Sequence, residues 1–417
     1  MRNTIKQVIL EQREIEKGRM ILRSFPEQLE KTSDIIVISG IRRCGKSVLM
    51  DQIRMRQKDS DYYINFDDER LLHFNVEHFQ LLNEVFIELF GVQKFYYFDE
   101  IQNIKGWERF VRRLYNSGNK IFITGSNAGM LSRELGTRLT GRYCSYELFP
   151  FSFREFLNIR NITVKKEDFI TTNGKAILIK QFNLYSEEGG FPVYLMQKNP
   201  LYLKSLYESI IYRDVMVRNY LTNEKEILEL VYFLAGNVAK LSSYNSLSKI
   251  IGVKNATTVM KYIGFIRNTY LIFQAAKFDY SLKKQIQNPK KTYFIDNALV
   301  KRLGFMFSDN SGRMLENLVF IELKRRGADV YYYKGKKECD FIIRTGAVVT
   351  DAIQVCYLFE NEATKKREVD GLLEAMDSYS LNSGLIITSD AEEAIRVKGN
   401  RIEVVPAWKW ILSNPVL

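Results

Sequence analysis

The sequence contains few of the residues that build disulfide frameworks, zinc sites or histidine-based active sites. Its 417 residues include 4 cysteines and 2 histidines, and the cysteines form no CxxC pair. Such scattered cysteines support neither a disulfide framework nor a zinc site. His73 and His78 have no partner nearby at a catalytic spacing, so histidine-based catalysis is not expected.

Long apolar runs and breaks in the chain are also scarce. The sequence has 7 prolines and no low-complexity stretch, so long disordered linkers are not expected. It has no apolar run of about 18 residues, the length that a transmembrane helix needs. Residues 1–18 mix acids and bases at helical spacing and lack the apolar centre of a signal peptide. These absences predict a cytoplasmic protein that does not contact a membrane.

What is present describes a basic globular protein. Hydrophobic residues make up 46% and charged residues 26% of the chain, as in ordinary soluble domains, and the length predicts about three domains. The formal net charge is +12. A basic balance favours a polyanionic partner such as nucleic acid, although a protein that binds only a nucleotide can have the same balance.

A phosphate-binding motif follows the first apolar strand pattern. Residues 34–39 read as a buried strand, residues 48–53 as the start of a helix, and GIRRCGKS lies between them. This is GxxxxGK[ST] in the strand–loop–helix context that a P-loop requires. The predicted nucleotide-binding residues are Gly40, Arg42, Arg43, Cys44, Gly45, Lys46, Ser47 and Val48.

The chemistry of this loop predicts ATP and Mg²⁺ as its ligands. The glycines let backbone N–H groups point at phosphate oxygens, and the start of the following helix adds positive potential. We expect Lys46 to reach the β- and γ-phosphates, and the Ser47 hydroxyl to hold Mg²⁺.

Paired acids end a second apolar strand, at residues 94–98. Asp99 is predicted to hold Mg²⁺, and Glu100 to orient and activate the attacking water. Transfer of a phosphoryl group to a hydroxyl does not need this second acid beside the first. The pair therefore favours hydrolysis.

Further catalytic candidates surround a third apolar strand, at residues 120–124. Ser126 or Asn127 could sense the γ-phosphate, although serine and asparagine are common at any strand end. Arg138 and Arg142 precede the next strand and are candidates for an arginine finger that meets the nucleotide of a neighbouring subunit. Such a finger contributes about 10³–10⁵ in rate and would imply a homo-oligomer. A solvated helix end explains these arginines equally well.

Several segments together resemble a known family. SGIRRCGKS, YYFDEIQNIKGWERF, FITGSNAGML and EEGGFPVYL resemble prokaryotic AAA-class ATPases with a winged-helix region and a C-terminal domain related to restriction endonucleases. The resemblance implies an α/β fold with a parallel P-loop sheet of the ASCE type, in which the strand at 120–124 separates the P-loop strand from the Asp99 strand. The expected domains are an ATPase domain at 1–160, a helical lid at 161–221, a winged helix at 222–300 and a restriction-endonuclease-like domain at 301–417.

The middle of the chain has the pattern of a winged helix. Two helices and a turn lead to a helix at 256–270, and two strands then form the predicted wing. Such a module can place a helix in the DNA major groove, but winged helices also bind proteins. The lysines expected at the wing tip, where they suit phosphate contacts, are Lys283, Lys284, Lys290 and Lys291.

The last hundred residues resemble a nuclease domain with altered site residues. Asp340 matches the first acid of the PD-(D/E)xK pattern, whereas Gln354 and Cys356 stand in place of the second acid and the lysine. An amide binds Mg²⁺ poorly compared with a carboxylate, so we expect the nuclease chemistry to be lost. The missing groups could still be replaced by nearby side chains: the lysine by Lys334, Lys336 or Lys337, and the second acid by Glu338.

The sequence therefore predicts an ATP-binding and ATP-hydrolysing AAA-class switch or motor whose C-terminal domains engage DNA or a protein partner. Two alternatives remain open at this point. One is an ATP-gated nuclease, and the other is a nucleotide-binding signalling scaffold with slow turnover.

Overall fold

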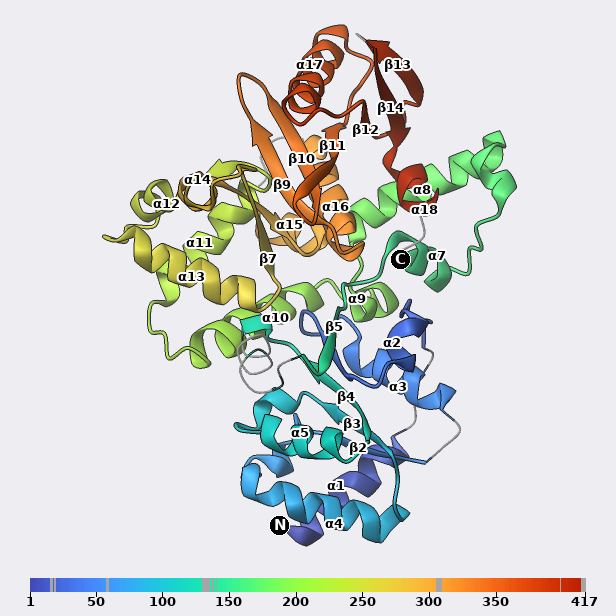
Figure 1. The fold of residues 1–417 in the computed structure, drawn as a ribbon, viewed down its shortest axis with the longest axis vertical. Helices are drawn as coiled ribbons and strands as arrows, with labels where there is room; N and C mark the ends of the chain where they lie inside the picture. The colour runs from blue at the N-terminus through green and yellow to red at the C-terminus, as the bar shows by residue number, and fades with distance from the viewer. Residues whose placement is uncertain are drawn as a thin grey trace. The chain divides into compact units, whose positions relative to one another are not determined.

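The computed structural model describes residues 1–15, 18, 20–57, 60–129, 136, 139, 141–304, 310–397 and 399–413. The chain forms two compact units (Figure 1). The N-terminal unit comprises Met1–Phe149 with Asn268–Tyr270, and the C-terminal unit comprises Pro150–Arg267 with Leu271–Leu417. No helix among the described residues is long and apolar enough to cross a membrane.

The N-terminal unit is built on a parallel five-stranded sheet with the order β2-β3-β4-β1-β5. Its strands are β1 (Ile35–Ser39), β2 (Asp61–Asn65), β3 (Phe95–Asp99), β4 (Lys120–Gly125) and β5 (Tyr143–Glu147). The expectation that the strand at 120–124 separates the other two is confirmed, because β4 pairs with both β1 and β3. Most strand residues are buried, and parallel strands covered on both faces read as continuous apolar runs.

Helices and 3₁₀ turns connect these strands. They are α1 (Arg2–Glu14), α2 (Glu27–Lys31), α3 (Lys46–Arg56), η1 (Glu69–Leu71), η2 (Val76–His78), α4 (Phe79–Phe90), η3 (Ile101–Asn103) and α5 (Glu108–Asn116). Aromatic side chains fill the space between helices and sheet, as where Tyr62 stacks on Phe86 with ring centroids 4.7 Å apart. The hydrophobic effect of burying such rings, about 1.5–3 kcal/mol each, holds the sheet rigid beneath its loops.

The first half of the C-terminal unit is mainly helical. Its helices are α7 (Phe153–Ile159), η4 (Lys166–Phe169), α8 (Thr172–Glu188), α9 (Pro192–Gln197), α10 (Tyr202–Ser209), η5 (Ile210–Val217), α11 (Glu224–Gly236), α12 (Tyr244–Ile250), α13 (Ala256–Asn268), α14 (Leu282–Gln287) and α15 (Asn297–Leu303). Among them lies an antiparallel sheet with the order β6-β8-β7, formed by β6 (Leu241–Ser242), β7 (Ile272–Ala276) and β8 (Lys290–Phe294). Local chemistry sets the helix starts: Ser152 and Glu155 form a capping box at α7.

The second half of the unit is a six-stranded sheet with the order β13-β14-β12-β11-β10-β9. Its strands are β9 (Asp329–Lys334), β10 (Glu338–Thr345), β11 (Val348–Cys356), β12 (Ser383–Thr388), β13 (Glu393–Val397) and β14 (Asn400–Pro406), and its helices are α16 (Ser311–Arg325), α17 (Glu362–Ser378) and α18 (Ala407–Ser413). Phe341 of β10 packs against Phe320 of α16, whereas its neighbour Ile342 joins a core cluster with Leu372 of α17. Because successive strand residues face opposite sides, α16 and α17 cover opposite faces of this sheet.

One of the four lysines predicted at a wing tip lies elsewhere. Lys283 and Lys284 are exposed on α14, and Lys290 begins β8 with partial exposure. Lys291, however, is buried among three carboxylates. The prediction that Lys291 contacts phosphate at an exposed tip is therefore wrong, since its ammonium group already has partners inside the unit.

Candidate functional site: the phosphate loop and the carboxylate cluster

The phosphate loop joins β1 to α3 and needs glycine at both of its ends. Gly40 and Gly45 have φ angles of 147° and 102°, which L side chains rarely adopt. A Cβ atom at Gly40 would lie 2.2 Å from the carbonyl oxygen of Leu148. The loop therefore packs directly against the segment that follows β5.

Two further contacts hold the loop on that segment. Cys44 donates its thiol to the Leu148 carbonyl oxygen at 3.3 Å, and the pKa of Cys44 is raised by burial, so it remains a thiol. The guanidinium of buried Arg23 donates to the carbonyl oxygens of Cys44 and, at 2.7 Å, of Phe149. The sequence carried no motif that indicated Arg23, because it precedes β1 and meets the loop only after folding.

Lys46 begins α3 and turns its ammonium group into the loop. Its Nζ lies 3.2 Å from the carbonyl oxygens of Gly40 and Ile41 and 3.4 Å from Oε1 of Glu100. Burial by itself would lower the pKa of Lys46, but the charges of Glu100 and Asp99 with the Cys44 thiol together outweigh burial, and the pKa is raised. The loop thus carries a permanent positive charge at its centre.

Asp99 ends β3 beside the first turn of α3 and is fully buried. It accepts hydrogen bonds from the hydroxyl groups of Thr124, Ser47 and, at 3.4 Å, Tyr63. Burial, followed by the charge of Glu100, raises the pKa of Asp99 to about 6. The hydroxyl of Ser47 and the carboxylate of Asp99 are hard oxygen donors side by side, which is the donor type that Mg²⁺ requires.

Glu100 follows β3 in a left-handed conformation with φ 51°. Its backbone N–H donates to Thr124 Oγ1 at 2.8 Å, and its Oε2 accepts from Ser126 at 3.0 Å and from Gln102. Burial would raise the pKa of Glu100, but Lys46 and these donors lower it. Glu100 is therefore a partly buried carboxylate that stays ionised and has a fixed orientation.

Thr124 and Gln102 were not recognised from the sequence. Thr124 lies at the carboxyl end of β4, the strand next to β3, so its hydroxyl meets both Asp99 and Glu100. The expected strand order could have identified Thr124, because a hydroxyl at the end of the strand next to the paired acids lies close to those acids.

The remaining predicted loop residues lie at different depths. Arg42 is half-buried with its guanidinium 3.9 Å from Asp67, Arg43 is exposed with φ 64°, and Val48 is exposed on the first turn of α3. Ser126 contacts Glu100, and Asn127 is buried beyond the end of β4. Ser126 therefore lies where it can respond to the paired acids.

Arg142, one of the two arginine-finger candidates, is not near the phosphate loop of its own chain. Arg142 precedes β5, where its carbonyl oxygen accepts from Ile35 N–H at 2.9 Å at the start of β1. The P-loop follows the other end of β1, so Arg142 lies at the opposite edge of the sheet. Arg138 lies outside the described residues. A role for Arg142 in the nucleotide site of its own chain is excluded, and a role across a subunit boundary stays a prediction.

The altered nuclease pattern of the C-terminal unit comes together at a cavity of about 810 Å³. The Asp340 backbone N–H donates to Gln354 Oε1 at 3.1 Å, and Gln354 donates to Glu368. Cys356 donates to a carbonyl oxygen at 3.3 Å, and burial raises its pKa to about 11. The cation beside Asp340 is Lys291 of β8, at 2.8 Å, a residue that the sequence pattern did not place there.

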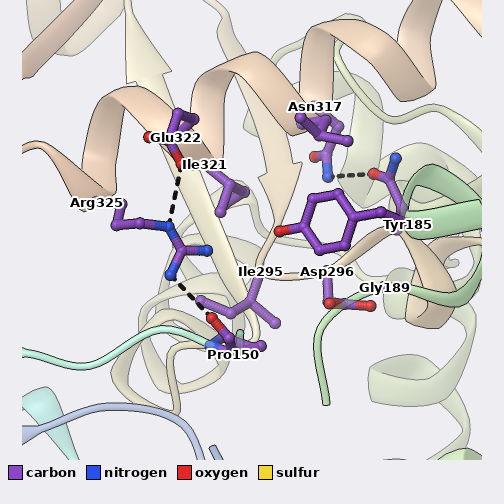
Figure 2. A pocket seen from close by; sticks show the side chains of 11 residues that line it. Pro150, Tyr185, Gly189, Ile295, Asp296, Asn317, Ile321, Glu322 and Arg325 are labelled. Carbon is purple, nitrogen blue, oxygen red and sulfur yellow. Dashed lines mark hydrogen bonds and ion pairs between the residues drawn. The ribbon is translucent and has the colours of Figure 1, made fainter. Parts of the chain in front are cut away.

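A second polar site in this unit is internal (Figure 2). Asp296 accepts from the N–H groups of Gly190 at 2.6 Å and Ala298 at 2.9 Å, and burial raises its pKa to about 6. Arg325 donates to the Pro150 carbonyl oxygen at 2.8 Å and pairs with Glu322. The cavity between them measures about 20 Å³, room for about one water molecule, so this network is structural.

Comparison with known proteins places the chain in a family. A family model for an AAA domain matches residues 32–157, and a model for a domain of unknown function matches residues 179–310. Uncharacterized protein MJ1544 of Methanocaldococcus jannaschii is 37% identical, with 98% of this chain and 95% of that protein covered. An uncharacterized protein of Haemophilus influenzae is 32% identical, with 93% and 96% covered.

The chain belongs to the family of these two proteins, and residues 32–157 form an AAA domain.

Solved structures are more distant from this AAA-domain protein. The RuvB Holliday junction branch migration motor of Thermotoga maritima is 12% identical with a TM-score of 0.27, covering 59% of this chain and 86% of that chain. PCH-2 of C. elegans is 13% identical with a TM-score of 0.28, covering 49% and 61%. At these TM-scores neither structure bears on the function of this chain.

Proposed function

We propose that the N-terminal unit binds ATP and hydrolyses it. The observation that carries this proposal is the group of Lys46, Ser47, Asp99 and Glu100, gathered at the carboxyl edge of a parallel sheet inside an AAA domain, with Lys46 and Asp99 buried. Ligands of open parallel sheets bind at this edge.

Each of these residues has a task that its surroundings fit. Lys46 contacts two neutral carbonyl groups and one carboxylate at 3.2–3.4 Å, which it can exchange for phosphate oxygens. Ser47 and Asp99 would hold Mg²⁺, which supplies positive charge against the phosphates when bound. Glu100 stays ionised, because Lys46, Gln102 and Ser126 lower its pKa, and an ionised carboxylate can accept a proton from the attacking water.

Two substitutions test this proposal. Lys46→Ala should abolish nucleotide binding, measured with a fluorescent ATP analogue. Glu100→Gln should retain binding while phosphate release falls by about 10²–10⁴-fold, the contribution typical of a general base. Lys31→Ala and Glu84→Gln are matched controls, because both side chains are exposed. Equal phosphate release by wild type and Glu100→Gln would refute the catalytic assignment, and negligible release by wild type would favour the scaffold alternative.

An arginine finger across a subunit boundary remains a proposal of its own. Arg142 lies at the edge of the sheet opposite its own phosphate loop, which is compatible with a neighbour's nucleotide. Mixing Arg142→Ala chains with Lys46→Ala chains should then restore part of the turnover, because each chain supplies what the other lacks. Turnover that does not depend on protein concentration, with no rescue, would mean that Arg142 is merely solvated.

We further propose that residues 222–300 form a winged helix that contacts DNA, with a protein partner as the other outcome. Exposed cations support DNA: Lys254, Lys261 and Arg267 lie on or beside α13, and Lys283 and Lys284 lie on α14. DNA affinity should fall with salt at a log–log slope of about −0.9 per neutralised phosphate. Replacing the exposed lysines should flatten that slope, and binding that ignores salt would favour the protein partner.

We also propose that residues 301–417 are a restriction-endonuclease-like domain without nuclease activity. Gln354 is bound to Glu368 and to the Asp340 backbone, and Cys356 is a neutral thiol. Lys334 and Lys337 pair with Glu338 and Asp370. These contacts disfavour the ATP-gated nuclease. If wild type cleaves DNA and Asp340→Ala does not, the nuclease alternative would be correct.

A further inference from the structure

Lys291 makes three ion pairs inside the C-terminal unit. Its side chain is 3% exposed, and its Nζ lies 2.8 Å from Asp340 Oδ1, 3.0 Å from Glu316 Oε1 and 3.1 Å from Glu338 Oε1. An ammonium group has three N–H donors and no acceptor. Lys291 therefore meets one carboxylate with each donor.

The carboxylates around Lys291 have other protein donors as well. Asp340 Oδ2 accepts from the Val355 N–H at 3.1 Å, Glu316 Oε1 accepts from the Tyr293 hydroxyl at 2.7 Å, and Glu338 pairs with Lys334 at 3.0 Å. A divalent ion such as Mg²⁺ needs about six oxygens in near-octahedral order. To bind here it would have to displace the lysine and reorganise these bonds.

The energetics favour the lysine over an exchanging ion. Removing one partner of a buried ion pair is strongly destabilising, because the remaining charges lose their compensation. The backbone of Lys291 is held in place, since β8 is hydrogen-bonded on both sides, to β6 and β7.

We propose that Lys291 is a permanent internal cation that takes the place of a divalent metal ion among Glu316, Glu338 and Asp340, so that this group of side chains needs no metal ion. The lysine comes from the three-stranded sheet, whereas its partners come from α16 and β10. It therefore also fastens the sheet of the proposed DNA-contacting region to the C-terminal sheet. This inference is independent of ATP hydrolysis.

Conversion of the lysine site into a metal site provides the first test. Full-length Lys291→Met, which keeps the apolar stem but removes the charge, should gain about one Mn²⁺ per chain, since three carboxylates are released together. Isothermal titration without nucleotide measures the gain, and Lys291→Met/Asp340→Asn should lose it. Wild type and Asp340→Asn should bind the same amount of Mn²⁺, because Asp340 holds no ion while Lys291 is present. Asp99→Asn in every chain suppresses binding at the nucleotide site.

A second measurement uses the unaltered chain, in case Lys291→Met does not fold. Acetylation with a small amine-reactive ester, followed by mass spectrometry, should modify exposed Lys336 readily and Lys291 very slowly. Excess Mn²⁺ or Mg²⁺ should leave the rate at Lys291 unchanged. Faster labelling of Lys291 with Mn²⁺ would show that the ion displaces it, and would overturn the proposal. Two results of the Mn²⁺ titration would also overturn the proposal. One is wild-type binding of Mn²⁺ that depends on Asp340, and the other is a folded Lys291→Met chain that binds no Mn²⁺.

Discussion

The two units each bury a lysine beside acidic residues, but they hold it in different ways. Lys46 has two backbone carbonyl groups and one carboxylate, all at 3.2 Å or more. Lys291 has three carboxylates at 2.8–3.1 Å. Both pKa values are raised, despite burial that by itself would lower them. Charge state therefore does not distinguish the two lysines.

The strength and chemistry of the contacts do distinguish them. A carbonyl group is neutral, so Lys46 can give up its partners for the more negative oxygens of a phosphate. Lys291 has no better partner available, because charge-assisted bonds to carboxylates are already the strong kind. The comparison shows that a buried lysine is available for a ligand only where the protein leaves its charge partly uncompensated.

The largest expected difference is in turnover. Lys46→Met should lower phosphate release by about 10³-fold or more, as loss of a cation aimed at the transferred phosphoryl group implies. Lys291→Met, provided that it folds, should leave turnover per folded chain near the wild-type value. Steady-state phosphate release with both variants checks this, and equal losses would remove the distinction between the two lysines.

Stability should show the reverse order. Lys291→Met should lower the free energy of unfolding by about 3–5 kcal/mol, because it leaves buried carboxylates without their cation. Lys46→Met should cost less, since Glu100 keeps its bonds to Ser126 and Gln102. Urea titration of the nucleotide-free chains gives both values. A larger loss for Lys46→Met would contradict the comparison.

Asp296 sharpens the comparison as a buried carboxylate whose main partners are backbone N–H groups. Its pKa is raised from 3.8 to about 6, so its contribution to stability is complete below pH 3.8 and is lost as the pH rises through 6. The loss is about 3 kcal/mol, at 1.36 kcal/mol per pKa unit. Asp296→Asn should remove this pH dependence from the unfolding midpoint, whereas exposed Asp351→Asn should leave it in place.

The smallest expected effect concerns the hydroxyl that joins the paired acids. Thr124→Val should lower turnover by about 10–100-fold, because Asp99 and the Glu100 N–H each lose a buried hydrogen-bond partner worth about 1–3 kcal/mol. Thr124→Ser keeps the hydroxyl and should recover most of the activity. Nucleotide affinity should change little in either variant. The measurement is therefore the kcat of Thr124→Val and of Thr124→Ser, each compared with wild type.

Much of the N-terminal unit could be predicted because its signals are local. The P-loop, its flanking strand and helix, and the paired Asp99–Glu100 each lie within a few consecutive residues. The position of β4 between β1 and β3 followed from the family resemblance and is confirmed. Arg23, Gln102 and Thr124 could not be assigned, because their contacts with the site depend on strand order and on a loop that returns to it.

The C-terminal unit shows where such prediction ends. The sequence by itself determined that Asp340 stands without its usual second acid and lysine, because Gln354 and Cys356 occupy those positions. Only the tertiary structure decided which cation faces Asp340. Lys291 lies 49 residues before Asp340 in the chain. The sequence pattern around Lys291 by itself fits an exposed wing. Packing of β8 against α16 and β10 buries its stem and brings three carboxylates to its ammonium group, and no local pattern encodes that meeting.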